Sequence, residues 1–287
     1  MLCQIERNIV QQKISIGNKV LYDLCKKSWD DEKYLDENPL GQEYLAAQMW
    51  LIGRSYAASP ERRNYKVKVK YTNSGDGLDT FFDCLAHKLL ERGTDVNKEY
   101  MEVLRYLSPH KNFEYTFDDE EKDLKVLCDS IRAVELFNET IKKARYKIDE
   151  EDIKKSGVDN LQQIQEGQSN LISFCSKFLH FHAPNFVFIK DGITGSHFKL
   201  TGKHYGFQFK ESIKSEIIIS RDDIKAMFEK VKKFNDCSLL SDYGKHCIKE
   251  YLLAKEIRKH AEGEMGSAPI TRIVDTYMLM ANIRKDD

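Results

Sequence analysis

Residues 118–141, DDEEKDLKVLCDSIRAVELFNETI, predict the longest helix of the chain. The acidic run DDEEKD at 118–123 complements the positive end of a helix macrodipole, so it is more typical of a helix start than of a metal site. The apolar side chains after it recur every three or four residues, which is the repeat of one helix face. They are Leu127, Ile131, Val134, Phe137 and Ile141.

Similar repeats on both sides of this stretch predict a mainly α-helical fold. Two parts of the sequence do not show this helical repeat. Apolar residues alternate with lysine over 66–71, which predicts a short extended or β segment, and residues 185–207 are the least helical part. We expect two regions, 1–155 and 156–287. Ser220 is expected to cap one helix, Gly93 to follow the end of another, and Pro269 to open a third. The predicted helices cover residues 4–27, 40–58, 79–92, 98–107, about 161–181, 221–234, 238–260 and 270–283.

Composition narrows the class of protein. Only 5 prolines and 15 glycines occur in 287 residues, which favours long helices over a many-turned β-sandwich. The formal net charge is −1, so any binding of nucleic acid must use a local patch. The seven cysteines form no C-x-x-C pair, which favours reduced, mostly buried thiols. Early charges and the lack of a long apolar run predict a cytoplasmic protein without a secretion signal or membrane span.

One local patch is basic and aromatic and lies at residues 54–71. It contains six lysines and arginines against one acid, Glu61, and so carries a charge of +5. Such a segment could bind phosphates while an aromatic or arginine side chain enters the base stack. A solvated charged edge that discourages strand pairing is the alternative interpretation. The candidates for nucleic-acid binding are Arg54, Tyr56, Arg62, Arg63, Lys66 and Lys68, together with Lys190 and His197 farther along the chain.

The segment NLISFCSKFLHFHAPNFVFIKDGITGSHFKL, residues 170–200, carries the strongest functional signal. It places an apolar helix with Ser176-Lys177 before a proline loop, an apolar run from Phe186, and Asp191. This order resembles the helix-hairpin-helix superfamily of base-excision DNA glycosylases, and most closely its bacterial branch similar to 8-oxoguanine glycosylases. The resemblance covers roughly residues 155–205. It implies a helical glycosylase-like fold.

The resemblance also implies a reaction, which is cleavage of the N-glycosidic bond of a base flipped out of DNA. The carboxylate of Asp191 would stabilise the positive charge that develops on the sugar, and Lys177 could attack C1′ as an amine. No cofactor or metal is expected. Glycosylase-like proteins of this branch also occur in bacterial CBASS anti-phage operons, so the resemblance permits an accessory role in defence and a protein partner from the same operon.

Other interpretations of the same residues stay open. Asp191-Gly192 is also a strong hairpin-turn signal, and Lys177 could be an ordinary solvated helix residue. His180-x-His182 invites a metal hypothesis, but residues i and i+2 point to different faces of a helix. The stretch before this helix lacks the glycine-rich hairpin turn of the superfamily. A binding module that recognises nucleic acid, a nucleobase or a protein without cleavage is therefore the alternative function.

Overall fold

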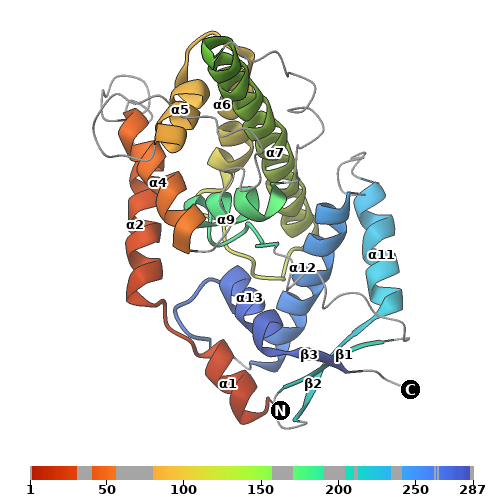
Figure 1. The fold of residues 1–287 in the computed structure, drawn as a ribbon. Coiled ribbons are helices and arrows are strands. Elements are labelled where there is room, and N and C mark those ends of the chain that lie inside the picture. The colour runs from red at the N-terminus through yellow and green to blue at the C-terminus, as the bar shows by residue number, and fades with distance from the viewer. Residues whose placement is uncertain are drawn as a thin grey trace. The chain divides into compact units, whose positions relative to one another are not determined.

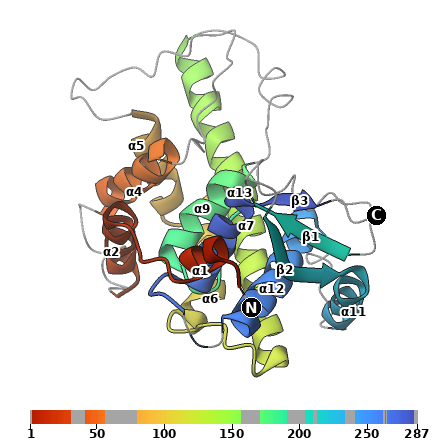
Figure 2. The ribbon, with the colours of Figure 1, turned by 90° about the horizontal axis from the view of Figure 1, so that it is seen from below.

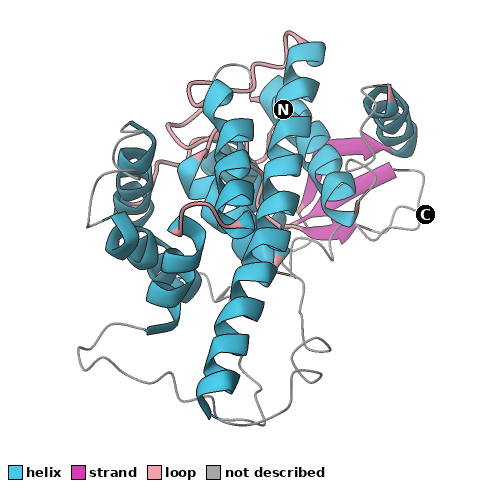
Figure 3. Cartoon of the chain, turned by 90° about the horizontal axis from the view of Figure 1, so that it is seen from above, coloured by secondary structure: helices cyan, strands magenta, loops and turns pink. Residues whose placement is uncertain are grey.

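A computed structural model shows a mainly α-helical protein (Figures 1 and 3). It describes residues 2–30, 41–55, 80–156, 171–190, 204–209, 213–233, 241–261, 263 and 265–284. The predicted extended segment at 66–71 and most of the basic segment lie outside these residues. The described elements are α1 (Gln4–Val10), α2 (Ile16–Asp30), α4 (Gly41–Ser55), α5 (Thr80–Leu90), α6 (Asp95–Leu107), the 3-10 helix η1 (Ser108–His110), α7 (Glu120–Ser156), α9 (Ile172–His182), β1 (His204–Gln208), β2 (Lys214–Ser220), α11 (Arg221–Lys232), α12 (Asp242–His260), α13 (Ile270–Met280) and β3 (Asn282–Arg284).

The residues group into two compact units, and neither is continuous in sequence. The first unit contains Met1–Val20, His110–Arg132 and Ala183–Asp287, and the second contains Leu21–Pro109 and Ala133–His182. Helices α2 and α7 each contribute residues to both units. These are groups of residues in contact rather than tested folding domains, so the expected regions 1–155 and 156–287 stay a prediction.

The first unit combines helices with a small antiparallel sheet of order β2-β1-β3 (Figure 2). Side chains of β2 alternate, with Ser215, Ile217 and Ile219 buried and the residues between them exposed. This two-residue period lets one face of the strand pack against α11 and α12. A second part of the core is aromatic. Tyr115 stacks on Phe188, with ring centroids 5.7 Å apart.

The second unit has an aromatic core built on α7 and α9. Phe137 and Phe178 stack with ring centroids 5.2 Å apart, and Tyr100 of α6 lies 5.9 Å from Phe137 on the same centroid measure. Just before α9, the backbone N–H of Leu171 donates to Oδ1 of Asn138 at 2.8 Å. Within this unit, helix α4 packs against α5 and α9.

The helical prediction is confirmed, and several of its details hold. The five apolar residues predicted to face the core from 127 to 141 are all buried. Ser220 caps α11 by accepting the N–H of Asp223, and Gly93 has a positive φ of 82° after α5. In the part of the chain that the structure describes, no helix is long and apolar enough to cross a membrane. Of the six cysteines that the structure describes, four are buried.

Two predicted helix boundaries are wrong. The helix expected over 4–27 is divided into α1 and α2, because the N–H of Gly266 donates to the carbonyl of Val10 at 2.9 Å where α1 ends. The helix expected to run to residue 283 ends at Met280, because residues 282–284 pair with β1 as strand β3. In both places hydrogen bonds with a distant segment replace the next helical turn.

Candidate functional site

Lys177, the predicted nucleophile, lies in the middle of α9 and is only 6% exposed. Its neighbour Ser176 is fully buried. The alternative interpretation of Lys177 as a solvated helix residue is therefore wrong. Lysine is almost never buried to this extent unless its ammonium group is paired, and Lys177 does have an interaction partner. It belongs to the second unit, whereas Lys190 and the chain just before it belong to the first.

The two histidines of α9 are both engaged by protein groups. The Nε2 of His180 lies 2.9 Å from the hydroxyl of Tyr22. His182 donates its Nδ1–H to the carbonyl of Phe178 at 2.9 Å, and its ring centroid lies 4.4 Å from that of the Phe178 ring, with the two planes tilted by 39°. Burial lowers the pKa of His182 to about 4, so the ring is neutral at pH 7. Among the described residues, no group of three or more His, Cys, Asp or Glu side chains is arranged to hold a metal ion.

After α9 the chain turns at residues 183–186, and the next residues, Val187, Phe188 and Ile189, are buried but belong to no described strand. Side chains of α12, and not a neighbouring strand, form hydrogen bonds with their backbone carbonyls. The hydroxyl of Tyr243 donates to the carbonyl of Phe188 at 2.8 Å, and the ring of His246 lies 3.2 Å from the carbonyl of Ile189. Helix α12 therefore positions the chain as far as Lys190. Asp191, with the hairpin turn that was its alternative, lies outside the described residues, as does His197.

Lys190 joins two lysines of α12 in a basic cluster, which we call the Lys190 cluster: Lys190, Lys245 and Lys249. Lys249 is half-buried. Burial lowers its pKa, and the charges of Lys245 and Lys190 lower it further, while Asp242 opposes them. Lys245 lies 3.7 Å from Asp242, and the charges of both side chains act on Lys249.

Helix α12 also carries a buried histidine–carboxylate pair, next in sequence to Lys245 and Lys249. The Nε2 of His246 is 3.1 Å from Oε1 of Glu250, and both side chains are buried. The same nitrogen lies 3.2 Å from the carbonyl oxygen of Ile189. The carbonyl oxygen of Ile189 can only accept a hydrogen bond, so Nε2 carries the ring proton.

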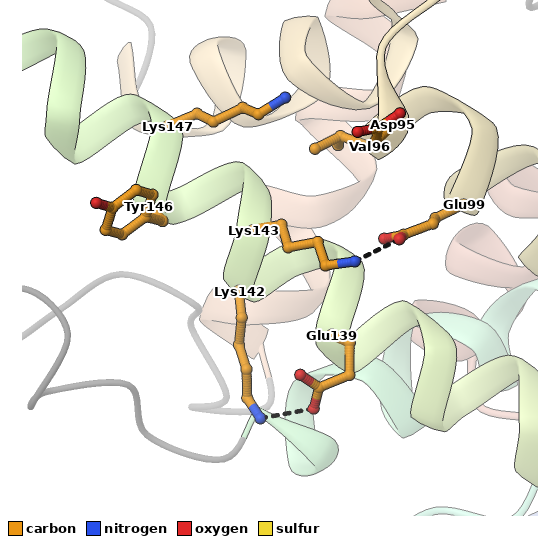
Figure 4. A pocket seen from close by; sticks show the side chains of 8 residues that line it. All are labelled: Asp95, Val96, Glu99, Glu139, Lys142, Lys143, Tyr146 and Lys147. Carbon is orange, nitrogen blue, oxygen red and sulfur yellow. Dashed lines mark hydrogen bonds and ion pairs between the residues drawn. The ribbon is translucent and has the colours of Figure 1, made fainter.

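The second unit has a surface groove of about 540 Å³ between α6 and α7 (Figure 4). Lys142 pairs with Glu139 at 2.8 Å, and Lys143 pairs with Glu99. Three lysines and three acids line the groove, so it carries no net charge and does not form an anion site. Its lining residues are Asp95, Val96, Glu99, Glu139, Lys142, Lys143, Tyr146 and Lys147.

Of the candidate residues in the predicted basic segment, the structure describes only Arg54. It is exposed near the end of α4. The remaining candidates Tyr56, Arg62, Arg63, Lys66 and Lys68 lie outside the described residues. The prediction for this segment therefore stays a prediction.

Sequence reasoning selected Lys190 but missed the lysines of α12. Lys245 and Lys249 are four residues apart, so they share one face of a helix, but this spacing is also ordinary on solvated helices. The two lysines become relevant only because His246, between them on α12, contacts the carbonyl of Ile189, next to Lys190. No pattern in the local sequence predicts that contact. The run KKARYK at 142–147, which lines the groove, was also not singled out.

No protein family matches this chain, and no curated protein sequence or solved structure is similar to it at a significant level.

Proposed function

We propose that this protein binds nucleic acid and recognises a flipped nucleobase in the manner of a DNA glycosylase, with Asp191 as the carboxylate that assists cleavage of the N-glycosidic bond. The observation that carries the proposal is the Lys190 cluster, in which the charges of Lys190 and Lys245 both act on the half-buried Lys249. Lys190 directly precedes Asp191 in sequence. Lysines bind the phosphates that position DNA on a protein, and phosphate contacts supply most of the affinity that is independent of sequence.

The chemistry requires few groups. Loss of the base leaves positive charge on the sugar, and a carboxylate near C1′ stabilises the transition state through that charge. The base must leave the stack before the bond breaks. An accessory role in bacterial anti-phage defence, with a partner from the same operon, belongs to the same proposal.

A second candidate function is a binding module that does not cleave. It is favoured by the burial of Lys177, which at 6% exposure does not offer its amine to a substrate. A glycosylase that lacked this amine could still release the base by activating water. The two candidates therefore differ in whether any base is released.

Base release from defined duplexes tests the proposal. The protein is incubated with duplexes bearing 8-oxoguanine or uracil, and the free base is measured by mass spectrometry. We expect release by the wild type, loss of release in Asp191→Asn, and retention in Lys177→Met if that variant is folded. Salt-sensitive binding without release by the wild type would support the binding module. The absence of both release and binding would overturn both candidate functions.

A further inference from the structure

The surface groove between α6 and α7 has charged side chains on both of its walls (Figure 4). On the α6 wall, Asp95 and Glu99 are one helical turn apart. On the α7 wall, the lining residues recur every three or four positions and so share one face of the helix. They are Glu139, Lys142, Lys143, Tyr146 and Lys147. All residues of both walls belong to the second unit.

Two ion pairs neutralise four of these charged groups. Lys143 of α7 pairs with Glu99 of α6, across the groove. Lys142 pairs with Glu139 at 2.8 Å, along α7. Glu99 and Lys142 are half-buried, so each of the two pairs is partly shielded from water. These four groups are therefore engaged by internal contacts, and a ligand would have to break an ion pair to reach them.

One charge of each sign is left at the other end of the groove. Asp95 is one helical turn before Glu99, and Lys147 is one turn after Lys143. In Figure 4 the Nζ of Lys147 extends toward the start of α6, where Asp95 lies, but no ion pair joins the two side chains. Lys147 is half-buried and has no ion-pair partner in the part of the chain that the structure describes. The carboxylate of Asp95 has only Lys98, at 3.8 Å, and both of those side chains are well exposed.

This pair of opposite charges favours a ligand that itself carries both signs. An anion bound to Lys147 would also face the carboxylate of Asp95, and a cation bound to Asp95 would also face the ammonium group of Lys147. A ligand with a carboxylate and an ammonium group satisfies both residues. The groove has a volume of about 540 Å³, which lies within the range of roughly 300–1,000 Å³ that is usual for small-molecule sites. Val96, almost fully buried, adds apolar surface to the α6 wall.

We propose that this end of the groove binds a small zwitterion, an amino acid or a short peptide, with its carboxylate on Lys147 and its ammonium group on Asp95. The inference goes beyond the proposed function and does not rest on it. The groove belongs to the second unit, whereas the Lys190 cluster belongs to the first. Loss of nucleic-acid binding would therefore leave this inference standing.

Glycine, diglycine and triglycine are suitable probes because they carry the same two charges at increasing separation. Each is titrated into the ¹⁵N-labelled protein, and the backbone amide signals of α6 and α7 are followed by NMR. We expect saturable shifts confined to the groove, with a dissociation constant of about 1 mM, since ion pairs at a surface contribute little each. Tightest binding of glycine would assign the site to an amino acid, and tightest binding of a longer probe would assign it to a peptide.

Capping the probes tests whether both charges are recognised. The N-acetylated form of the best probe lacks the ammonium group, and the C-terminal amide lacks the carboxylate. Each capped form should bind about fivefold more weakly than the parent probe. Undiminished binding of the acetylated form would show a plain anion site, and undiminished binding of the amide would show a plain cation site. Either result would overturn the inference, as would shifts that do not saturate.

Two variants test the residues. Lys147→Met and Asp95→Asn should each weaken binding of the parent probe by about fivefold. The matched controls should bind as the wild type does. They are Lys125→Met, exposed on the same helix α7, and Asp242→Asn, which like Asp95 is an exposed first residue of a helix with a lysine three positions later.

Combining the variants with the capped probes separates recognition of charge from a structural role. Lys147→Met should bind the parent probe and its amide equally, because the partner of the missing carboxylate is already gone. Asp95→Asn should likewise not distinguish the parent from the acetylated probe. Thermal unfolding checks that each variant is folded. Full sensitivity to the caps in folded Lys147→Met and Asp95→Asn would assign the ligand to other residues and overturn the inference.

Discussion

Glu6 is a fully buried carboxylate that ties three elements of the first unit together. The hydroxyl of Tyr277 in α13 donates to its Oε1 at 3.0 Å, and Ser215 of β2 donates to the same oxygen. Its other oxygen accepts the backbone N–H of Cys3 at 2.7 Å, which closes the first turn of α1. A buried carboxylate is tolerated only when its oxygens are hydrogen-bonded, so these donors hold α1, β2 and α13 in place.

Removing one donor should therefore destabilise the protein. We expect Tyr277→Phe to lower the free energy of unfolding by about 1–3 kcal/mol, because it leaves a buried acceptor with one partner fewer. Urea denaturation measures the change. The control is Tyr146→Phe at the surface groove, where we expect a change within about 0.5 kcal/mol. Equal effects of the two substitutions would show that the Glu6 network adds no stability.

His182 makes stability depend on pH. Its folded pKa of about 4 is below the ordinary value of 6.5. Between these values the unfolded chain binds a proton that the native ring does not, so stability falls as pH decreases from about 6.5 to about 4. The loss from this ring should be about 2 kcal/mol at pH 5.

The variant His182→Gln removes the titrating ring. Urea denaturation at pH 7 and pH 5 should show a smaller drop in the variant than in the wild type. His87→Gln, at an exposed position, is the control and should keep the wild-type drop. An identical pH dependence in His182→Gln and the wild type would contradict the assignment of a neutral ring.

At the scale of elements, local patterns predicted helices well and their interruptions poorly. The repeat of apolar residues predicts α7, and Ser220 predicts the start of α11, because these signals lie within the element itself. The break after Val10 depends on Gly266, more than 250 residues later in the chain, and the end of α13 depends on pairing with β1. Neither contact can be predicted from the sequence next to the helix end.

The same limit applies to the candidate site. The sequence singled out Lys190 as one of the basic candidates for nucleic-acid binding. It also singled out Lys177. The burial of that side chain could not be predicted, because a lysine on a helix is normally exposed. Lys245 and Lys249 were not selected, because their relation to Lys190 depends on the contact between His246 and Ile189.

Gly266 permits the close approach of two backbones at the break between α1 and α2. A Cβ atom at this position would collide with the carbonyl of Gln12 and the backbone of Gln11. We expect Gly266→Ala to lower the free energy of unfolding by about 1–3 kcal/mol, since backbone must move to accept the methyl group.

Gly17 is the matched control for this substitution. It lies in α2 with open space around its Cα, so Gly17→Ala should raise stability by up to about 1 kcal/mol through helix propensity. Thermal unfolding compares the two variants. A Gly266→Ala protein as stable as the wild type would show that the backbone approach does not determine the break.

At the scale of the whole molecule, the chain passes between its two units four times. The crossings fall after Val20, Pro109, Arg132 and His182. The last one separates α9, with Lys177, from the segment that leads to Lys190. Residues that are close in sequence thus belong to different units, and the resemblance to glycosylases, which was based on a continuous stretch, spans this crossing.

Because the whole chain has a net charge of −1, it is not attracted to nucleic acid as a whole. The central proposal is therefore that nucleic acid binds through one local group of lysines, the Lys190 cluster. The most direct test is the affinity for duplex DNA measured over a range of salt concentrations. The wild type is compared with Lys190→Met/Lys245→Met and with the control Lys225→Met/Lys259→Met. Both control lysines are well exposed and ion-paired within their own helices.

Each lost phosphate contact reduces the slope of log affinity against log salt by about 0.9. We therefore predict that the cluster variant binds more weakly and has a slope smaller by about 2, while the control keeps nearly the wild-type slope. Equal slopes and affinities for the cluster variant and the control, or wild-type binding that does not respond to salt, would contradict the claim.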